Sequence, residues 1–258
     1  MNQTQFPERH PYGASVLLFL AAIIIFLAAG AIVALLELPP AALYILAFGG
    51  LAAVCAILLT KNRWWREVGF RAPYERRLLW LFWLPFVPAI GNLLDGLSVT
   101  DPKQIMLFFV MAVLSGFVEE ILFRGLILRA LLPTGIWRAA LLSAALFGGM
   151  HMLNALSISS PTYAILQVGY AAAIGFAYAA LVIRTGAIWP LILAHFLTNF
   201  AGFLAAGSAG SDGPVAVREF AFAAAYIILW RLRRFSASCW QSRGKSGRVL
   251  KSLKRLAI

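Results

Sequence analysis

The amino-acid sequence predicts an all-α, polytopic integral membrane protein, a bundle of about eight transmembrane helices. Three observations support this fold class. Of the 258 residues, 62% are hydrophobic, whereas soluble domains contain roughly 45–50% apolar residues. Only 12% of the residues are charged, and no polar stretch is long enough to form a soluble domain. The charges gather in short segments between long apolar runs, as in loops that connect membrane spans.

Span length gives the positions of the individual helices. About 20 apolar residues are needed to cross roughly 30 Å of hydrocarbon. The first apolar run is too long for a signal peptide and follows a segment with little positive charge, so we expect a retained helix. This criterion predicts eight spans, at residues 14–36, 41–60, 78–98, 104–128, 138–157, 162–183, 186–206 and 215–231.

The charge distribution predicts the orientation. A formal net charge of +12 would also suit a nucleic-acid-binding protein. Most positive charges, however, lie in the loop 61–77 and the tail 231–255, each beside a predicted span. Such clusters mark the cytoplasmic side and contact anionic lipid head groups. We therefore expect membrane lipids and not nucleic acid as partners, a location in the cell membrane, and two cytoplasmic termini.

Apart from charged residues near the span ends, five charged or histidine side chains lie inside the predicted spans, where burying a charge is costly and marks a candidate functional group. At a rise of about 1.5 Å per residue, Glu119 lies about 15 Å from the cytoplasmic face, His195 roughly 13 Å and His151 roughly 20 Å. Three helices should therefore bring carboxylates and imidazoles to similar depths. The five residues are Glu119, Glu120, Arg124, His151 and His195.

The stretch GFVEEILFRG contains three of these residues. Glu120 and Arg124 are four residues apart and can pair on one face of a helix. Glu119 points about 100° away from Glu120. We therefore expect Arg124 to hold Glu120, while Glu119 is free to meet the histidines.

Two further stretches complete the candidate site. In HFLTN, the side chains of His195 and Asn199 lie one helical turn apart on the same face. In FGGMH, Phe147 precedes His151 by one turn, and the glycines at 148 and 149 are expected to let neighbouring helices approach closely.

The stretches EEILFR, FGGMH and HFLTN resemble the three motifs of the CPBP intramembrane endopeptidases. This family groups type II CAAX prenyl proteases, of the Ras-converting-enzyme type, with bacteriocin-processing and bacteriocin-immunity proteins. The resemblance covers roughly residues 104–206. We therefore predict three regions: 1–103, with three spans and the basic loop; 104–206, the catalytic core; and 207–258, with the last span and the basic tail.

The resemblance implies an endopeptidase in which a glutamate activates water, without a cofactor. Glu119 resembles the general base, and Glu120 with Arg124 the supporting pair. The other motif residues resemble groups that position the water and stabilise the oxyanion: His151, His195 and Asn199.

Three alternatives stay open at the level of sequence. Glu119, His151 and His195 could instead hold a zinc ion, although no HExxH motif is present. Chains of Glu and His also mark ion paths, so a proton- or solute-coupled transporter is the second functional hypothesis. A non-catalytic immunity protein is the third. For an endopeptidase, the expected substrate is a peptide or a membrane protein, with CAAX tails as the substrates of some relatives.

Overall fold

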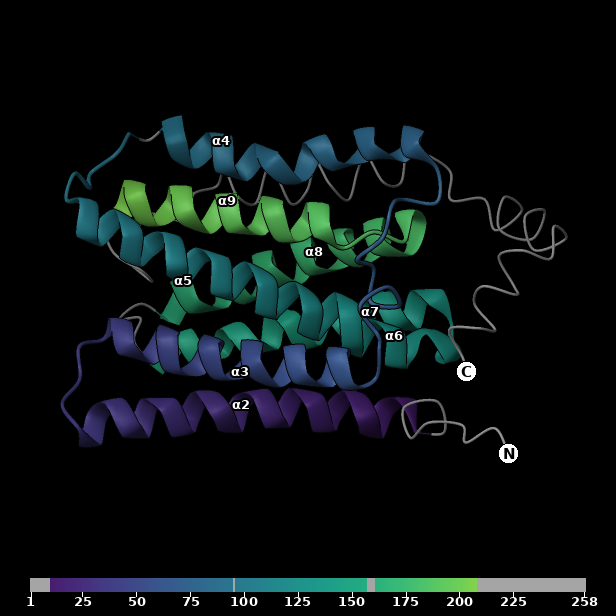
Figure 1. Ribbon diagram of the computed structural model, residues 1–258, viewed down its shortest axis with the longest axis horizontal. Coiled ribbons are helices and arrows are strands. Elements are labelled where there is room, and N and C mark those ends of the chain that lie inside the picture. The colour runs from purple at the N-terminus through teal and green to yellow at the C-terminus, as the bar shows by residue number, and fades with distance from the viewer. Residues whose placement is uncertain (1–9, 95, 157–160, 208–258) are drawn as a thin grey trace, which may run out of the picture.

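The computed structural model describes residues 10–94, 96–156 and 161–207, and every regular element within them is a helix (Figure 1). Seven of these helices are long and apolar enough to cross a membrane. They correspond to the first seven predicted spans, and the fold class is confirmed. The eighth predicted span, 215–231, and the basic tail lie outside the described residues.

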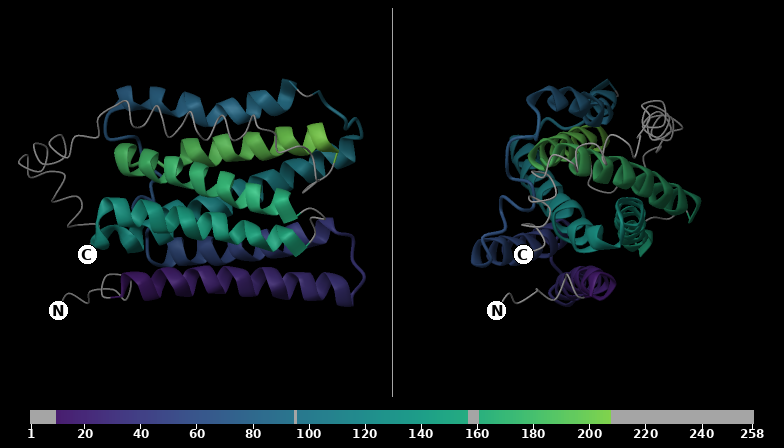
Figure 2. Two further views of the ribbon diagram at one scale, coloured as in Figure 1. Left: turned by 180° about the vertical axis from the view of Figure 1, so that it is seen from behind. Right: turned by 90° about the vertical axis from the view of Figure 1, so that its right-hand side faces the viewer.

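The helices run roughly side by side along the long axis of the molecule (Figures 1 and 2). Their bounds differ from the predicted spans by a few residues at most ends. In chain order, the elements are α2 (Pro11–Leu35), α3 (Ala41–Lys61), η1 (Arg76–Phe86), α4 (Val87–Leu94), α5 (Pro102–Glu120), η2 (Ile121–Ile127), α6 (Leu128–Leu131), η3 (Leu132–Thr134), α7 (Ile136–Met150), η4 (His151–Leu156), α8 (Pro161–Thr185) and α9 (Trp189–Ala206).

The third span is less regular than predicted. Instead of one α-helix over 78–98, it consists of the 3₁₀ segment η1 followed by α4, and it ends at Leu94. Pro85 lies inside η1 and Pro88 in the first turn of α4. Proline has no N–H to donate and clashes with the preceding turn, so this sequence cannot continue a regular α-helix.

The fourth span is the central rod of the bundle. It runs continuously from Pro102 to Thr134 through α5, η2, α6 and η3, and 50% of its most apolar window is buried, compared with 11% for α2. α5 packs against α3 and α9. The segment η2 is a π-helix, in which the carbonyl of Phe123 accepts from the N–H of Leu128, five residues on. Such segments are rare and often occur at functional sites.

Glycines let neighbouring helices of the bundle approach closely. A Cβ atom at Gly116 would lie 2.9 Å from the backbone nitrogen of Phe196, so α5 and α9 touch there. A Cβ atom at Gly148 would lie 2.8 Å from the Cβ of Ala172, where α7 meets α8. The prediction for Gly148 is therefore confirmed. The prediction for Gly149 was wrong, because its nearest neighbour is the Cζ of Phe19, at 3.9 Å from the same hypothetical Cβ.

The basic loop after α3 packs against the turn between α8 and α9. The N–H of Tyr74 donates to the carbonyl of Thr185 at 2.9 Å, and the N–H of Ile188 donates to the carbonyl of Gly69 at 3.0 Å. Arg184 lies in the last turn of α8, beside this junction. The positive charges of the loop and of α8 therefore share one end of the bundle, as the charge pattern predicts. The orientation of that end in the membrane stays a prediction, as do the three regions of the chain.

Candidate active site

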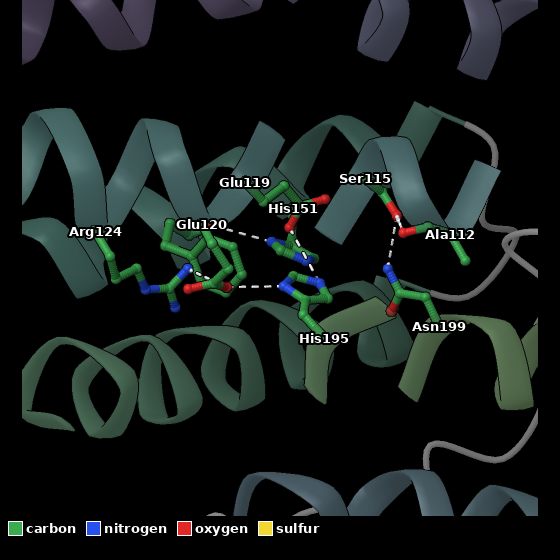
Figure 3. A network of polar contacts seen from close by, with 9 residues as sticks. Ala112, Ser115, Glu119, Glu120, Arg124, His151, His195 and Asn199 are labelled. Atoms are coloured by element: carbon green, nitrogen blue, oxygen red, sulfur yellow. Dashed lines mark hydrogen bonds and ion pairs between the residues drawn. The ribbon is translucent and has the colours of Figure 1, made fainter. Parts of the chain in front are cut away.

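The motif residues come from the core of the bundle. Glu119 and Glu120 are the last two residues of α5, and Arg124 is in the middle of the π-helix η2. His151 follows the last residue of α7, and α9 carries His195 together with Asn199. Figure 3 shows these side chains converging from three rods of the bundle.

Glu120 and Arg124 form the buried ion pair that their spacing predicts. Arg124 Nη1 donates to Glu120 Oε1 at 3.0 Å, and both side chains are 0% exposed. The guanidinium also lies over two aromatic rings, with its Cζ 4.1 Å from the ring centre of Phe147 and 5.3 Å from that of Tyr178. A cation in this position is stabilised by the ring faces as well as by the carboxylate. The pair is therefore fixed in a dry, aromatic environment.

His195 contacts both glutamates (Figure 3). Its Nδ1 lies 2.8 Å from Glu120 Oε1, and its Nε2 lies 3.6 Å from Glu119 Oε2. The prediction that the two carboxylates divide between Arg124 and the histidines was therefore wrong for Glu120. Its Oε1 atom faces Arg124 and His195 at the same time, because the last turn of α5 packs directly against α9.

These contacts favour one tautomer of the His195 ring. A carboxylate only accepts hydrogen bonds, so Nδ1 carries the proton that is donated to Glu120. The other ring nitrogen then faces Glu119. If both carboxylates are ionised, Arg124 balances one of them, and His195 balances the other only when Nε2 is also protonated. The electroneutral form of this buried cluster thus has an Nε2–H donor directed at Glu119.

The two halves of the cluster differ in their exposure. The side chains of Glu119 and His195 are 16% and 13% exposed, whereas those of Glu120 and Arg124 are fully buried. Glu119 Oε2 is buried and makes no hydrogen bond to the residues that the structure describes. Glu119 and His195 are consequently the accessible half of the cluster, and Glu120 with Arg124 is its support.

His151 lies close to the cluster without bonding to it directly. Its Nδ1 is 2.9 Å from the carbonyl oxygen of Phe147, one turn earlier, as the FGGMH spacing predicts. The Phe147 ring contacts both imidazoles, with centroid distances of 4.9 Å to His151 and 6.3 Å to His195. Among the described residues, no hydrogen bond or ion pair joins His151 to Glu119. The structure therefore brings His151 to the site through a shared aromatic neighbour.

Asn199 has a partner that the sequence analysis missed. Its Nδ2 donates to Ser115 Oγ at 2.9 Å, and Ser115 Oγ in turn donates to the carbonyl of Ala112 at 3.2 Å. Ser115 is buried and lies one turn before Glu119. The sequence did offer a signal for Ser115, because it is a single hydroxyl residue in an apolar run, four residues before a motif glutamate. Tyr178 had no such signal, because α8 contains no motif.

The donor set of the zinc alternative does not form a ready-made metal site. Within residues 10–94, 96–156 and 161–207, no three His, Cys, Asp or Glu side chains are grouped so that they could hold a metal ion. Glu119 and His195 approach each other, but among the described residues no hydrogen bond or ion pair joins His151 to either of them. These residues fit a hydrogen-bonded cluster better than a tetrahedral zinc site, which needs ligand atoms at about 2 Å from one ion.

One comparison with known proteins found a matching family model. Residues 101–201 match the family model described as Type II CAAX prenyl endopeptidase Rce1-like. A comparison with curated proteins gave no match, and a comparison with solved structures gave none either. The matched segment contains all three motifs and the elements from α5 to most of α9, and so the whole hydrogen-bonded cluster around His195. Residues 101–201 of this multi-pass membrane protein are thus similar to the Rce1-like type II CAAX prenyl endopeptidases, and this match supports membership of the CPBP family.

Proposed function

We propose that the protein is an intramembrane endopeptidase in which Glu119 activates the attacking water. The observation that carries this proposal is the pairing of Glu119 with His195 across 3.6 Å, on the accessible side of the buried Glu120–Arg124 pair. A general base must lie within hydrogen-bond reach of the water that it activates, directly beside the groups that stabilise the transition state. Glu119 meets this condition, because His195 is its immediate neighbour.

The chemistry follows from these positions. A water that is hydrogen-bonded to Glu119 gives it a proton as the water oxygen attacks the carbonyl carbon of the scissile peptide bond. The resulting oxyanion accepts hydrogen bonds from His195 Nε2–H and from the free N–H of the Asn199 amide. The C–N bond then breaks, and Glu119 returns its proton to the leaving amine. Glu119 ends the cycle as a carboxylate, and no cofactor takes part.

The remaining motif residues support this step. Glu120 accepts from His195 Nδ1 and so fixes the ring with Nε2 toward the reacting atoms. Arg124 holds Glu120 in place. His151 has its Nδ1 anchored on the carbonyl of Phe147, which leaves Nε2 to orient the water. Because these side chains are held in place before the reaction, they need no reorganisation when charge develops in the transition state.

The substrate follows from the family and from the position of the site. The matched family is named for CAAX prenyl endopeptidases, so a peptide with a prenylated CAAX tail is one candidate, and an unprenylated peptide or membrane protein is the other. We propose that cleavage occurs near the cytoplasmic face of the cell membrane. The basic loop indicates which end of the bundle is cytoplasmic, because positively charged loops are usually on that side of the membrane.

The test is a cleavage assay with matched glutamate variants. Purified protein in lipid nanodiscs is incubated with two sets of internally quenched peptides, one with a farnesylated CAAX tail and one unprenylated. Glu119→Gln should lose activity by at least about 100-fold, the usual range for a general base. The control, Glu37→Gln, changes an exposed glutamate in the turn after α2 and should cleave at the wild-type rate. Cleavage by Glu119→Gln at the wild-type rate would exclude this site.

A chelator separates the two possible chemistries. The wild-type protein is dialysed against EDTA and 1,10-phenanthroline and assayed again with the same peptides. We expect an unchanged rate. Loss of activity that is restored by added zinc would replace the proposed mechanism with a metal-dependent one.

A further inference from the structure

We infer that Ser115, which lies outside the three motifs, is a positioning residue for catalysis because it sets the orientation of the Asn199 amide. This inference rests on the proposed function and deepens it. It starts from the two hydrogen bonds of Ser115, which connect α9 to the turn of α5 that precedes Glu119 (Figure 3).

The direction of the two bonds is the central point. A hydroxyl has a single hydrogen to donate. Ser115 uses it on the carbonyl of Ala112, at 3.2 Å, and therefore offers only lone pairs to Asn199. An amide presents a donor at Nδ2 and an acceptor at Oδ1, so the lone pairs of Ser115 select Nδ2, which lies 2.9 Å away. One of the two N–H groups of Asn199 is thereby held, and the position of the other one is fixed.

The contact is built into the packing of the two helices. Ser115 is 2% exposed, so water does not compete for its hydroxyl. The next residue, Gly116, has no side chain at the place where a Cβ would come within 2.9 Å of the α9 backbone. This close approach keeps a short serine side chain within reach of Asn199. The same turn of α5 leads directly to Glu119, four residues on. One rigid helix therefore sets both the orientation of the Asn199 amide and the position of the Glu119 carboxylate.

Without Ser115, the amide of Asn199 can rotate about its terminal torsion, which has a broad energy profile. Its N–H would then face the developing oxyanion for only part of the time. Because the oxyanion exists only in the transition state, the loss should affect kcat and leave KM unchanged. A neutral hydrogen bond of this kind corresponds to a decrease in kcat of about 3- to 10-fold.

A double-mutant cycle tests the inference. The rate of cleavage of the quenched peptide that the wild type cuts fastest is measured for Ser115→Ala, Asn199→Ala and the double variant. We expect a lower kcat with unchanged KM for Ser115→Ala, and no further decrease when Ser115→Ala is added to Asn199→Ala, because residues that act through one another are not additive. Ser115→Cys, which retains a weaker acceptor, should recover part of the rate.

A matched serine controls for general damage to the fold. Ser15 is also 2% exposed, and its Oγ donates to the carbonyl of Pro11 at 2.8 Å, in α2, a helix that carries none of the motifs. Ser15→Ala should melt like Ser115→Ala and cleave like the wild type. A fully additive double variant, or a normal kcat for Ser115→Ala, would overturn the role of Ser115. If the role of Ser115 is overturned but Glu119→Gln is inactive in the same assay, the proposed function still stands. Failure of the inference can therefore be distinguished from failure of the proposed function.

Discussion

Glu119 and Glu120 are neighbours in the sequence with opposite surroundings. Glu120 is fully buried between Arg124 and His195, whereas the side chain of Glu119 is 16% exposed on the accessible side of the imidazole. In the proposed mechanism, Glu120 therefore supports the site, and Glu119 takes part in the reaction. Substitutions at the two positions should separate stability from activity.

Replacing Arg124 should destabilise the protein. Arg124→Ala leaves the carboxylate of Glu120 buried without its cation, a change that typically lowers the free energy of unfolding by about 3–5 kcal/mol. Arg124→Lys keeps the charge and loses the planar contact with the Phe147 ring, so its effect should be smaller. Thermal melting in detergent measures both effects, with Glu119→Gln as the comparison. A wild-type melting temperature for Arg124→Ala would contradict the structural role of the pair.

The motif residues could be found from the sequence, because a charge in an apolar span has few explanations. Their pairing could be predicted only in part. The spacing of Glu120 and Arg124 is a local property of one helix and was predicted correctly. The contact between Glu120 and His195 depends on the rotation of α9 relative to α5, which no local pattern fixes. Ser115 and Tyr178 were missed because Ser and Tyr are common in membrane helices for other reasons.

At the level of the elements, the π-helix η2 is the feature that the sequence did not predict. It follows Glu120 immediately and contains Arg124, whose guanidinium lies over the Phe147 and Tyr178 rings. A π-turn widens the helix, so the carbonyl of Phe123 also accepts from Ser143 Oγ of α7, at 2.8 Å. The hydrophobic pattern of a fully buried rod is the same for α- and π-geometry, and sequence periodicity therefore cannot distinguish them.

Two adjacent glycines give a test of helix packing. Gly148→Ala places a methyl group where only 2.8 Å separates it from Ala172 Cβ, so α7 and α8 must move apart, at a cost of about 1–3 kcal/mol. In Gly149→Ala, the new methyl group meets only Phe19, at 3.9 Å. Alanine also has a higher helix propensity than glycine, by about 1 kcal/mol in a helix interior. We expect a lower melting temperature for the first variant and an equal or higher one for the second. The reverse order would show that α7 packs on α8 through a different face.

For the whole molecule, the sequence predicted the number and position of the described spans well. Bilayer thickness imposes one length on every span, and this requirement is visible in a single sequence. The way in which the seven rods pack could not be predicted, because lipid-facing and buried surfaces of membrane helices are equally apolar. The close approaches at Gly116 and Gly148 illustrate this, because the need for glycine at each position is visible only when the neighbouring helix is in place.

The orientation of the bundle leads to a labelling prediction. Residue 66 is exposed in the basic loop, and Leu97 is 59% exposed between the third and fourth spans. In a protein whose Cys55 and Cys239 are replaced by alanine, Arg66→Cys should react with a membrane-impermeant maleimide only in inside-out vesicles. Leu97→Cys should react only in right-side-out vesicles. The opposite pattern would place the basic loop outside the cell and would contradict the proposed cytoplasmic cleavage.

The central claim is that the carboxylate of Glu119 and the imidazole of His195, from two different membrane crossings, share one water molecule. An experimental structure of the protein in lipid, at a resolution that shows ordered water, tests this claim most directly. We expect a water about 3 Å from both Glu119 and His195 Nε2, a typical hydrogen-bond distance. A metal ion at that position, or side chains of the two residues directed toward separate surfaces, would contradict the account.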